Sequence, residues 1–282
     1  MTPRTAGQPD LADIDRILRE DVGSGDLTAA TLPEHLRAKA LVVAREPMIL
    51  CGTAWFDAVF ERLGPGTKIQ WHYQDGNRIE TDQVLCHLEG PARSLMTGER
   101  SALNLLQTLS GTASQARCYA DAVQGTALRI LDTRKTIPGL RDAQKYAVTV
   151  GGCHNHRIGL YDGILIKENH IRAMGSISKA VEAANALGRA VMIEVEVETL
   201  DELEEALEAG VSRILIDEFT PEMRAEAVRK SRGKAEIEVS GSVRLEDLPA
   251  IAESGVDFVS IGSLTKHVRA IDLSMQVVIG AD

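Results

Sequence analysis

The sequence predicts an α/β fold built from two different parts, and two observations support this prediction. In the second part, short apolar runs end at Glu196, Asp217, Ser240 and Gly262, which are 21, 23 and 22 residues apart. Regular alternation of apolar strands with amphipathic helices is typical of a parallel sheet covered by helices. The first third instead has strand-like runs separated by short turns, which is typical of antiparallel pairing.

The first third is irregular, and each of its elements follows from a local pattern. Apolar residues at helical spacing predict helices, period-two runs predict strands, and the D-G-N turn at 75–77 favours antiparallel pairing of the strands around it. We expect a helix over 11–19, a turn-rich loop over 20–28, strands over 38–44, 67–73 and 83–88, and a long helix from 98 to about 123.

The second part has six strand–helix units, which make most of a parallel β/α barrel but not eight strands. The expected strands are 128–132, 163–167, 191–196, 213–217, 235–240 and 257–262. An open doubly wound sheet is the alternative fold, but no strand is followed by G-x-G-x-x-G. Chemistry in such barrels lies where the strands end, and here each strand ends in polar or small residues. We therefore expect six strand ends to converge on one site.

Composition excludes several classes of protein. The 282 residues have a net charge of −10, which argues against a nucleic-acid partner. No apolar run is long enough to span a membrane, and the start of the chain lacks the apolar core of a signal peptide. We therefore expect a cytoplasmic protein. Four scattered cysteines without a C-x-x-C pair predict free thiols rather than disulfides or a zinc site.

A local excess of cations stands out in this acidic chain. Residues 129–172 contain eight Lys/Arg and four Asp/Glu, a net of 8 − 4 = +4. Arginine matches a carboxylate with a planar fork, and lysine supplies a compact charge for phosphoryl oxygens. The candidate residues for a dicarboxylate and a string of phosphates are Arg134, Lys135, His156, Arg157 and Lys167. The alternative is a set of surface salt bridges.

Two carboxylates and two turns complete the candidate site. Glu196 and Asp217 end successive strands, and such a pair beside a phosphorylated ligand usually holds Mg²⁺. They could also balance the charges of Lys135 and Lys167. The small-residue turns, Ser240–Gly241–Ser242 and Ile261–Gly262–Ser263, could hold a terminal phosphate through backbone N–H groups, although each alone could be an ordinary turn.

Two other groups of residues do not predict a metal site. Cys153, His154 and His156 have the wrong spacing for a structural zinc site, and no distant Cys/His pair completes them. Asp21 and Asp26 lack the further oxygen ligands of a calcium loop, so we interpret that stretch as a structural turn.

Several long motifs resemble the quinolinate phosphoribosyltransferase family. They are E-D-V-G-S-G-D-L-T, E-R-S-A-L-N-L-L-Q-T-L-S-G, D-T-R-K-T-I-P-G-L-R, N-H-R-I-G-L-Y-D-G-I-L-I-K-E-N-H, E-V-E-V-E, E-V-S-G-S and S-I-G-S-L-T-K-H. The resemblance implies an N-terminal α/β sandwich domain over 1–113, rejoined by the C-terminal segment 268–282. It also implies an incomplete, roughly seven-stranded parallel β/α barrel over 114–267, and a homodimer in which the sandwich of one subunit caps the barrel of the other.

The resemblance also implies roles for matching residues. The quinolinate site would consist of Arg134, His156, Arg157 and Lys167, with Arg100 reaching in from the partner subunit. Phosphoribosyl pyrophosphate and Mg²⁺ would be held by Thr133, Lys135, Glu196, Asp217, Ser240, Gly241, Ser242, Ile261, Gly262 and Ser263, with Lys135, Lys167, Glu196 and Asp217 as the catalytic residues. The chain departs from the family pattern at Ile137, Cys153, Tyr161, Glu218 and Ser242, none of which removes a charge from the site.

The implied reaction joins the ribose to the nitrogen of quinolinate and releases pyrophosphate and CO₂, giving nicotinate mononucleotide for NAD biosynthesis. Three alternatives stay open at this stage. They are a phosphoribosyltransferase acting on nicotinate, an aldolase that forms a Schiff base through Lys167, and a sugar-phosphate sensor without catalysis.

Overall fold

The computed structural model describes residues 7–279, and the chain divides into two compact units. The first unit includes residues up to 117, then 136–152, and the chain from 264 onward. The second includes 118–135 and 153–263. The sequence predicted a domain boundary after residue 113, and this boundary stays a prediction. The compact units differ from it in one respect, because residues 136–152 belong to the first unit.

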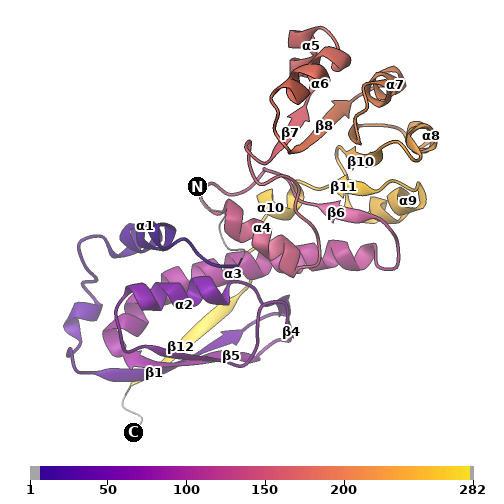
Figure 1. Cartoon of the computed structure of the whole chain (residues 1–282). Helices are drawn as coiled ribbons and strands as arrows, with labels where there is room; N and C mark the ends of the chain where they lie inside the picture. The colour runs from indigo at the N-terminus through magenta and orange to yellow at the C-terminus, as the bar shows by residue number, and fades with distance from the viewer. Residues whose placement is uncertain (1–6, 280–282) are drawn as a thin grey trace. The chain divides into compact units, whose positions relative to one another are not determined.

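The first unit contains a four-stranded antiparallel sheet with strand order β12-β1-β5-β3 (Figure 1). The expected antiparallel pairing around the turn at 75–77 is confirmed, although the short strand β4 follows that turn and pairs with β2. Strand β12 brings the C-terminal segment back beside β1, while residues 280–282 of that segment lie outside the described residues. The strands are β1 (Arg37–Ala44), β2 (Met48–Ile49), β3 (Lys68–Trp71), β4 (Arg78–Ile79), β5 (Val84–Pro91) and β12 (Leu273–Ile279).

Helices α2 and α3 lie on one face of this sheet and bury an apolar core that includes Phe56 and Phe60 (Figure 1). The long helix begins at Ala92, six residues before the expected start at Gly98. Gly98 lies inside this helix. A Cβ at this position would be only 2.7 Å from Cε1 of Phe60, so the glycine allows α3 to pack closely against Phe60. The helices of this unit include α1 (Leu11–Val22), α2 (Thr53–Arg62), α4 (Arg141–Val150) and most of α3 (Ala92–Ala122), while η1 (Ala29–Thr31) is a 3₁₀ turn and α10 (Ser263–Lys266) lies at the boundary.

The second unit contains a six-stranded parallel sheet with strand order β6-β11-β10-β9-β8-β7, as the repeat predicted. A seventh position is reduced to a single parallel bridge between Leu131 and His154. This arrangement agrees with an incomplete, roughly seven-stranded barrel. The strands are β6 (Arg129–Leu131), β7 (Gly163–Ile166), β8 (Met192–Val197), β9 (Arg213–Asp217), β10 (Glu236–Ser240) and β11 (Phe258–Ser260).

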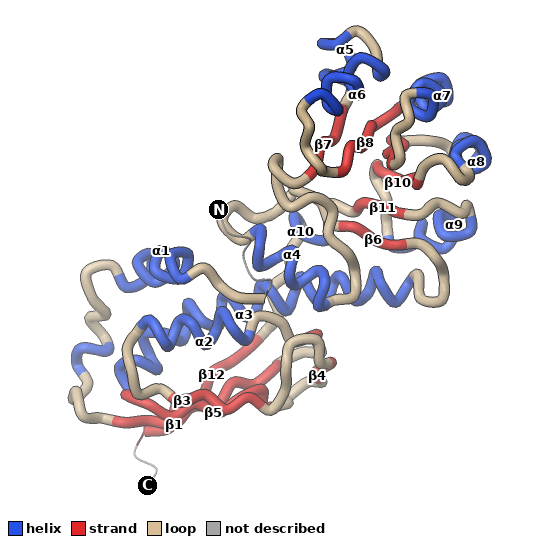
Figure 2. The backbone as a smooth tube through the Cα atoms, in the orientation of Figure 1, coloured by secondary structure: helices blue, strands red, loops and turns tan. Residues whose placement is uncertain are grey.

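Five helices connect successive strands of this sheet, and α6 to α9 lie along its outer side (Figures 1 and 2). They are α5 (Glu168–Met174), α6 (Ile177–Ala186), α7 (Leu200–Glu208), α8 (Pro221–Ser231) and α9 (Leu248–Glu253), which follows the 3₁₀ turn η2 (Leu245–Asp247). Side chains alternate between the two faces of a strand. The buried Ile214 and Ile216 therefore share one face of β9, and Arg213 and Asp217 share the other.

The structure also bears on the predicted state of the cysteines and on the search for membrane-spanning helices. All four cysteines are free, as predicted. Within residues 7–279, no helix has the length and apolar character needed to cross a membrane.

Candidate active site

The expected site residues, apart from Arg100, belong to the second unit. His156 and Arg157 follow the isolated bridge at His154, and the others lie at or just beyond the carboxyl ends of the strands. Lys167 directly follows β7, Glu196 is the penultimate residue of β8, and Asp217 and Ser240 end β9 and β10. Because the strands are parallel, these positions share one edge of the sheet. Thr133 to Lys135 follow β6, and Ile261 to Ser263 follow β11 at the same edge.

The Thr133 and Gly262 loops lie against each other. A Cβ built on Gly262 would be 2.9 Å from Cδ of Lys135 and 3.6 Å from Oγ1 of Thr133. The hydroxyl of Thr133 also accepts a hydrogen bond of 3.1 Å from the backbone N–H of Lys135. A small residue at 262 therefore leaves room for the lysine stem.

Lys167 and Glu196 form an ion pair at the ends of the adjacent strands β7 and β8. The Lys167 side chain is 42% exposed and that of Glu196 is 11% exposed, so the acid is the more buried partner. The side-chain nitrogen of Lys167 is engaged by the Glu196 carboxylate, whereas a Schiff base requires a lysine amine that is free to attack a carbonyl carbon. This contact disfavours the aldolase alternative, and it agrees with the charge-balancing role considered for Glu196.

Two arginines of like charge lie close together in this unit. The pKa of Arg157 is below its usual value, chiefly because the guanidinium is partly buried and also because Arg134 is nearby. Arg157 donates a hydrogen bond of 3.1 Å to the carbonyl oxygen of Gly163. Cations that destabilise each other in a partly dehydrated place favour an anionic ligand between or beside them.

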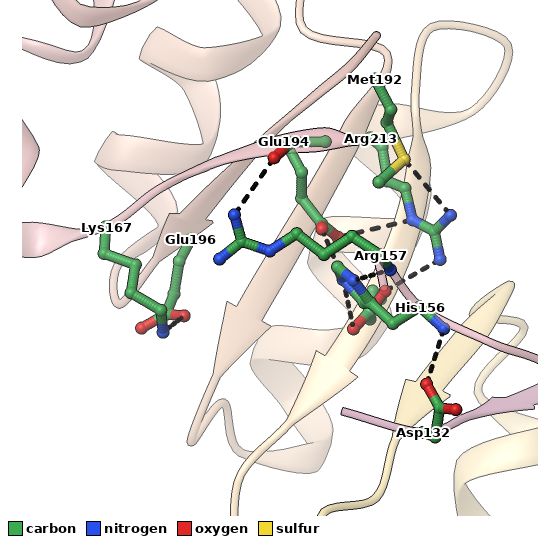
Figure 3. A network of polar contacts seen from close by, with 10 residues as sticks. Asp132, His156, Arg157, Lys167, Met192, Glu194, Glu196 and Arg213 are labelled. Atoms are coloured by element: carbon green, nitrogen blue, oxygen red, sulfur yellow. Dashed lines mark hydrogen bonds and ion pairs between the residues drawn. The ribbon is translucent and has the colours of Figure 1, made fainter. Parts of the chain in front are cut away.

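Hydrogen bonds to other protein groups hold both the ring and the backbone of His156 (Figure 3). Its Nε2 lies 2.8 Å from Oε2 of Glu194, and its Nδ1 accepts a hydrogen bond of 2.7 Å from the backbone N–H of Arg157. Its own backbone N–H donates to Oδ1 of the buried Asp132 at 2.9 Å. Both ring nitrogens are therefore engaged by protein groups.

His156 contacts a buried charge network that was not predicted from the sequence. Arg213 lies 2.8 Å from Glu238 and 3.4 Å from Glu194, and its guanidinium carbon is 3.8 Å from the ring centroid of Phe258. Glu194 and Glu238 are fully buried. Burial raises the pKa of both carboxyls, and the neighbouring Glu194 helps to raise that of Glu238 to about 7.

Strand alternation could have identified this network. In the run E-V-E-V-E the first and second glutamates are two residues apart, so a strand places them on the same face. Glu196 was expected at the site, and Glu194 therefore had to point into the same interior. The same argument places Arg213 with Asp217 and Glu238 with Ser240.

The imidazole of His156 and the carboxylates of Glu194 and Glu238 have ligand atoms within 4.8 Å of one another. Such a group could hold a metal ion, and it includes neither Cys153 nor His154 from the cluster rejected at the sequence level. Arg213 already lies against both carboxylates and supplies the compensating positive charge. We therefore interpret the group as a charge network.

The turn after β10 requires a glycine. Gly241 has φ +120°, and a Cβ there would be 2.9 Å from Oε1 of Glu218. Glu218 is itself in the left-handed region, with φ +53°. The departure at 218 therefore places a long acidic side chain, in a conformation that Asn adopts more readily, directly beside the expected phosphate turn.

Arg100 lies on helix α3 in the first unit and is exposed. The structure contains one chain, so the contribution of Arg100 to a partner's site stays a prediction.

Models of two protein domains match the chain. Residues 26–110 match the quinolinate phosphoribosyl transferase N-terminal domain, and residues 112–276 match the C-terminal domain. The chain belongs to the quinolinate phosphoribosyl transferase family. The two matches together include residues from both compact units of the chain.

Named relatives agree over nearly the whole length. A Bacillus subtilis protein named probable nicotinate-nucleotide pyrophosphorylase (carboxylating) is 42% identical over 259 residues, covering 92% of this chain and 90% of that one. A Mycobacterium leprae protein of the same name, without "probable", is 38% identical and covers 94% and 95%. The solved structure of the nicotinate-nucleotide pyrophosphorylase from Francisella tularensis has a TM-score of 0.92 at 42% identity and covers 98% and 100%.

Proposed function

We propose that this chain transfers the phosphoribosyl group of phosphoribosyl pyrophosphate to quinolinate. The products are nicotinate mononucleotide, CO₂ and pyrophosphate, and the reaction would serve de novo NAD biosynthesis. The family supports this proposal, and the observation that carries it is the pair Arg134 and Arg157. A partly buried Arg157, whose pKa is lowered by burial and by the nearby Arg134, provides with Arg134 two guanidiniums that suit a substrate with two carboxylates better than a monocarboxylate.

The residues of the chain would act mainly by binding, orientation and charge stabilisation. Arg134 and Arg157 would orient the pyridine ring so that its nitrogen faces C1 of the ribose. Lys135 and the two small-residue turns would hold the phosphates, and Lys167 would stabilise negative charge that develops between the substrates. The 2-carboxylate then leaves as CO₂, and the electron pair of the broken bond stays on a ring whose nitrogen is now cationic until that carbon takes up a proton from water.

We further propose that Glu196 and Asp217 hold Mg²⁺. Both carboxylates lie at the carboxyl ends of adjacent parallel strands, and hard oxygen donors of this kind suit Mg²⁺. When bound, the ion would neutralise charge on the departing pyrophosphate. Glu196 would share its negative charge between the ion and Lys167.

The finer predictions about assembly and location also belong here. We propose a homodimer in which Arg100 of one subunit completes the quinolinate site of the other, and we propose a cytoplasmic location. Arg100 is exposed on α3, so its guanidinium is accessible to a partner.

The direct test is to incubate the protein with quinolinate, phosphoribosyl pyrophosphate and Mg²⁺ and to measure nicotinate mononucleotide. A parallel reaction with nicotinate and no ATP separates the dicarboxylate from the monocarboxylate substrate. We expect product from quinolinate and little or none from nicotinate. Equal rates with the two substrates, or no product from either, would contradict the proposal.

A further inference from the structure

Arg213 lies within the parallel sheet and contacts the same two acids as His156. Its Nη2 is 2.8 Å from Oε2 of Glu238, and its Nε is 3.4 Å from Oε1 of Glu194. Nε2 of His156 lies 2.8 Å from the other oxygen of Glu194 and 3.7 Å from the other oxygen of Glu238. Each carboxylate therefore faces Arg213 with one oxygen and His156 with the other. Figure 3 shows Glu194 in this position between the two.

Further contacts hold the guanidinium of Arg213 in one orientation. Its Nη1 lies 3.5 Å from the sulfur of Met192, and its central carbon is 3.8 Å from the ring centroid of Phe258. The side chain is only 13% exposed. A planar guanidinium that lies over a ring and faces two carboxylates has a defined orientation, which a lysine ammonium lacks. The two acids are therefore ordered against a fixed partner.

The backbone and the side chain of Arg213 lead to different halves of the candidate site. Along the chain, β9 continues from Arg213 to Asp217, which we expect beside the phosphates and the metal ion. Through the side chain, the contacts run to the two acids and then to His156, whose Nδ1 lies 2.7 Å from the backbone nitrogen of Arg157. His156 and Arg157 belong to the expected quinolinate site. A role of the side chain therefore differs from a role of the strand in the substrate that it affects.

We propose that Arg213 is a positioning residue for the quinolinate half of the site. Its guanidinium orders Glu194 and Glu238, and these acids hold the imidazole of His156 at the start of the loop that carries Arg157. This proposal rests on the proposed function, in which His156 and Arg157 bind quinolinate. Supporting contacts of this kind commonly change affinity or activity by about 10- to 100-fold when they are removed.

The first experiment compares Arg213→Lys with the matched control Arg129→Lys in steady-state kinetics. Both replacements keep a positive charge and remove the planar fork. Arg129 is exposed on β6, and its guanidinium carbon is 5.8 Å from the centroid of the same Phe258 ring. We expect Arg213→Lys to raise the KM for quinolinate about tenfold, with kcat and the KM for phosphoribosyl pyrophosphate within about threefold of wild type. Arg129→Lys should resemble wild type.

Three kinetic results would overturn the proposal. An equal rise of both KM values, or a rise only for phosphoribosyl pyrophosphate, would assign the effect to β9 and Asp217 instead of the side-chain contacts. An unchanged KM for quinolinate in Arg213→Lys would remove the positioning role. The same rise in Arg129→Lys would show that the acids are not involved.

Phe258→Leu provides a second variant that leaves every charge in place. It removes the ring over which the guanidinium of Arg213 lies, so we expect a selective rise of about threefold in the KM for quinolinate. Urea denaturation establishes which variants are folded. If Arg213→Lys does not fold, Phe258→Leu carries the kinetic test, and an unchanged KM for quinolinate would then overturn the proposal.

The second experiment observes the ring of His156 without any substrate. The protein has seven histidines, so selective ¹⁵N labelling of histidine gives a small spectrum, and the signals lost in His156→Gln identify this residue. We expect Arg213→Lys to shift the side-chain signals of His156 and Arg129→Lys to leave them unchanged. Unchanged signals of His156 in a folded Arg213→Lys protein would overturn the proposal.

The two experiments separate failure of the positioning role from failure of the proposed function. If the wild-type protein makes no nicotinate mononucleotide but Arg213→Lys shifts the signals of His156, the proposed function is wrong and the ordering of His156 by Arg213 stands. If the wild-type protein is active and neither the KM for quinolinate nor the signals respond to Arg213→Lys, the function stands and the positioning role is wrong.

Discussion

The two sheets of this molecule use their buried faces in opposite ways. In the antiparallel sheet of the first unit, alternate residues such as Val42, Cys86 and Leu88 are buried with the apolar core under α2 and α3. In the parallel sheet, the face opposite the helices carries Glu194 and Glu238, which are just as deeply buried. Burying charge costs free energy unless partners compensate it, and here Arg213 lies against both carboxylates. The comparison predicts that mutations in the first sheet reduce stability and mutations in the second reduce activity.

The largest effect on stability should come from the apolar core of the first unit. Phe56 is 0% exposed and packs against Phe60 and Trp71. Phe56→Ala should lower the free energy of unfolding by about 3–5 kcal/mol, because it removes buried surface and leaves a cavity. Urea denaturation measures the loss. If the comparison holds, kcat/KM at a temperature where the variant is folded should stay within about threefold of wild type.

The largest effect on activity should come from the paired arginines. Arg157→Ala removes a fixed cation and should lower kcat/KM for quinolinate on the order of 100- to 1000-fold, with little change in unfolding. The matched control is Arg37→Ala, which removes an exposed arginine from the antiparallel sheet. Near-normal activity in Arg157→Ala would remove the basis for the dicarboxylate site, and a large effect of Arg37→Ala would contradict the division of roles between the two sheets.

Glu238 makes the stability of the second unit depend on pH. Its folded pKa of about 7 lies above the ordinary value of 4.5, so the folded state holds a proton that the unfolded chain releases. This contribution is complete below about pH 4.5 and is lost as the pH rises through about 7. Glu238→Gln cannot ionise. Its free energy of unfolding should therefore rise relative to wild type by up to about 3 kcal/mol between pH 5 and pH 8.

The control for this titration is Glu236→Gln, which changes the same chemical group on an exposed position two residues earlier in β10. Denaturation of the three proteins at several pH values separates the effect of the buried site from that of net charge. A pH-independent difference between Glu238→Gln and wild type would mean that Glu238 is ionised throughout this range.

The smallest effect on the free energy of unfolding should come from backbone strain at Glu218, which directly follows β9. Glu218 has φ +53°, a conformation that asparagine adopts more readily. Glu218→Asn should raise the free energy of unfolding by about 1 kcal/mol. Glu218→Gln removes the same charge without the preference for this conformation and serves as the control. Equal shifts in the two variants would assign the effect to charge instead of strain.

The sequence predicted the features that depend on periodicity. The spacing of the strand ends predicted the parallel sheet, and the polar residues after each strand predicted which side chains share its carboxyl edge. The family motifs added the identity of the fold. The short strands β2 and β4 were missed, because two-residue strands contain too few residues to show a period.

The buried network was missed for a different reason. Glu194, Arg213 and Glu238 lie within strands, where a charged residue in a sequence is normally interpreted as facing solvent. The register pairs Arg213 with Glu194 in β8 and with Glu236 in β10, and Glu238 lies two residues beyond Glu236 on the same face. The contact between Nδ1 of His156 and the backbone N–H of Arg157 is also encoded by no residue pattern.

The most direct test of the proposed chemistry is the stoichiometry of a single reaction with quinolinate labelled in its 2-carboxyl group. Phosphoribosyl pyrophosphate and Mg²⁺ are supplied, and labelled CO₂, pyrophosphate and nicotinate mononucleotide are measured together. The account predicts one CO₂ and one pyrophosphate for each mononucleotide, with all three nearly abolished in Arg157→Ala. CO₂ release without mononucleotide, or unchanged yields in Arg157→Ala, would contradict it.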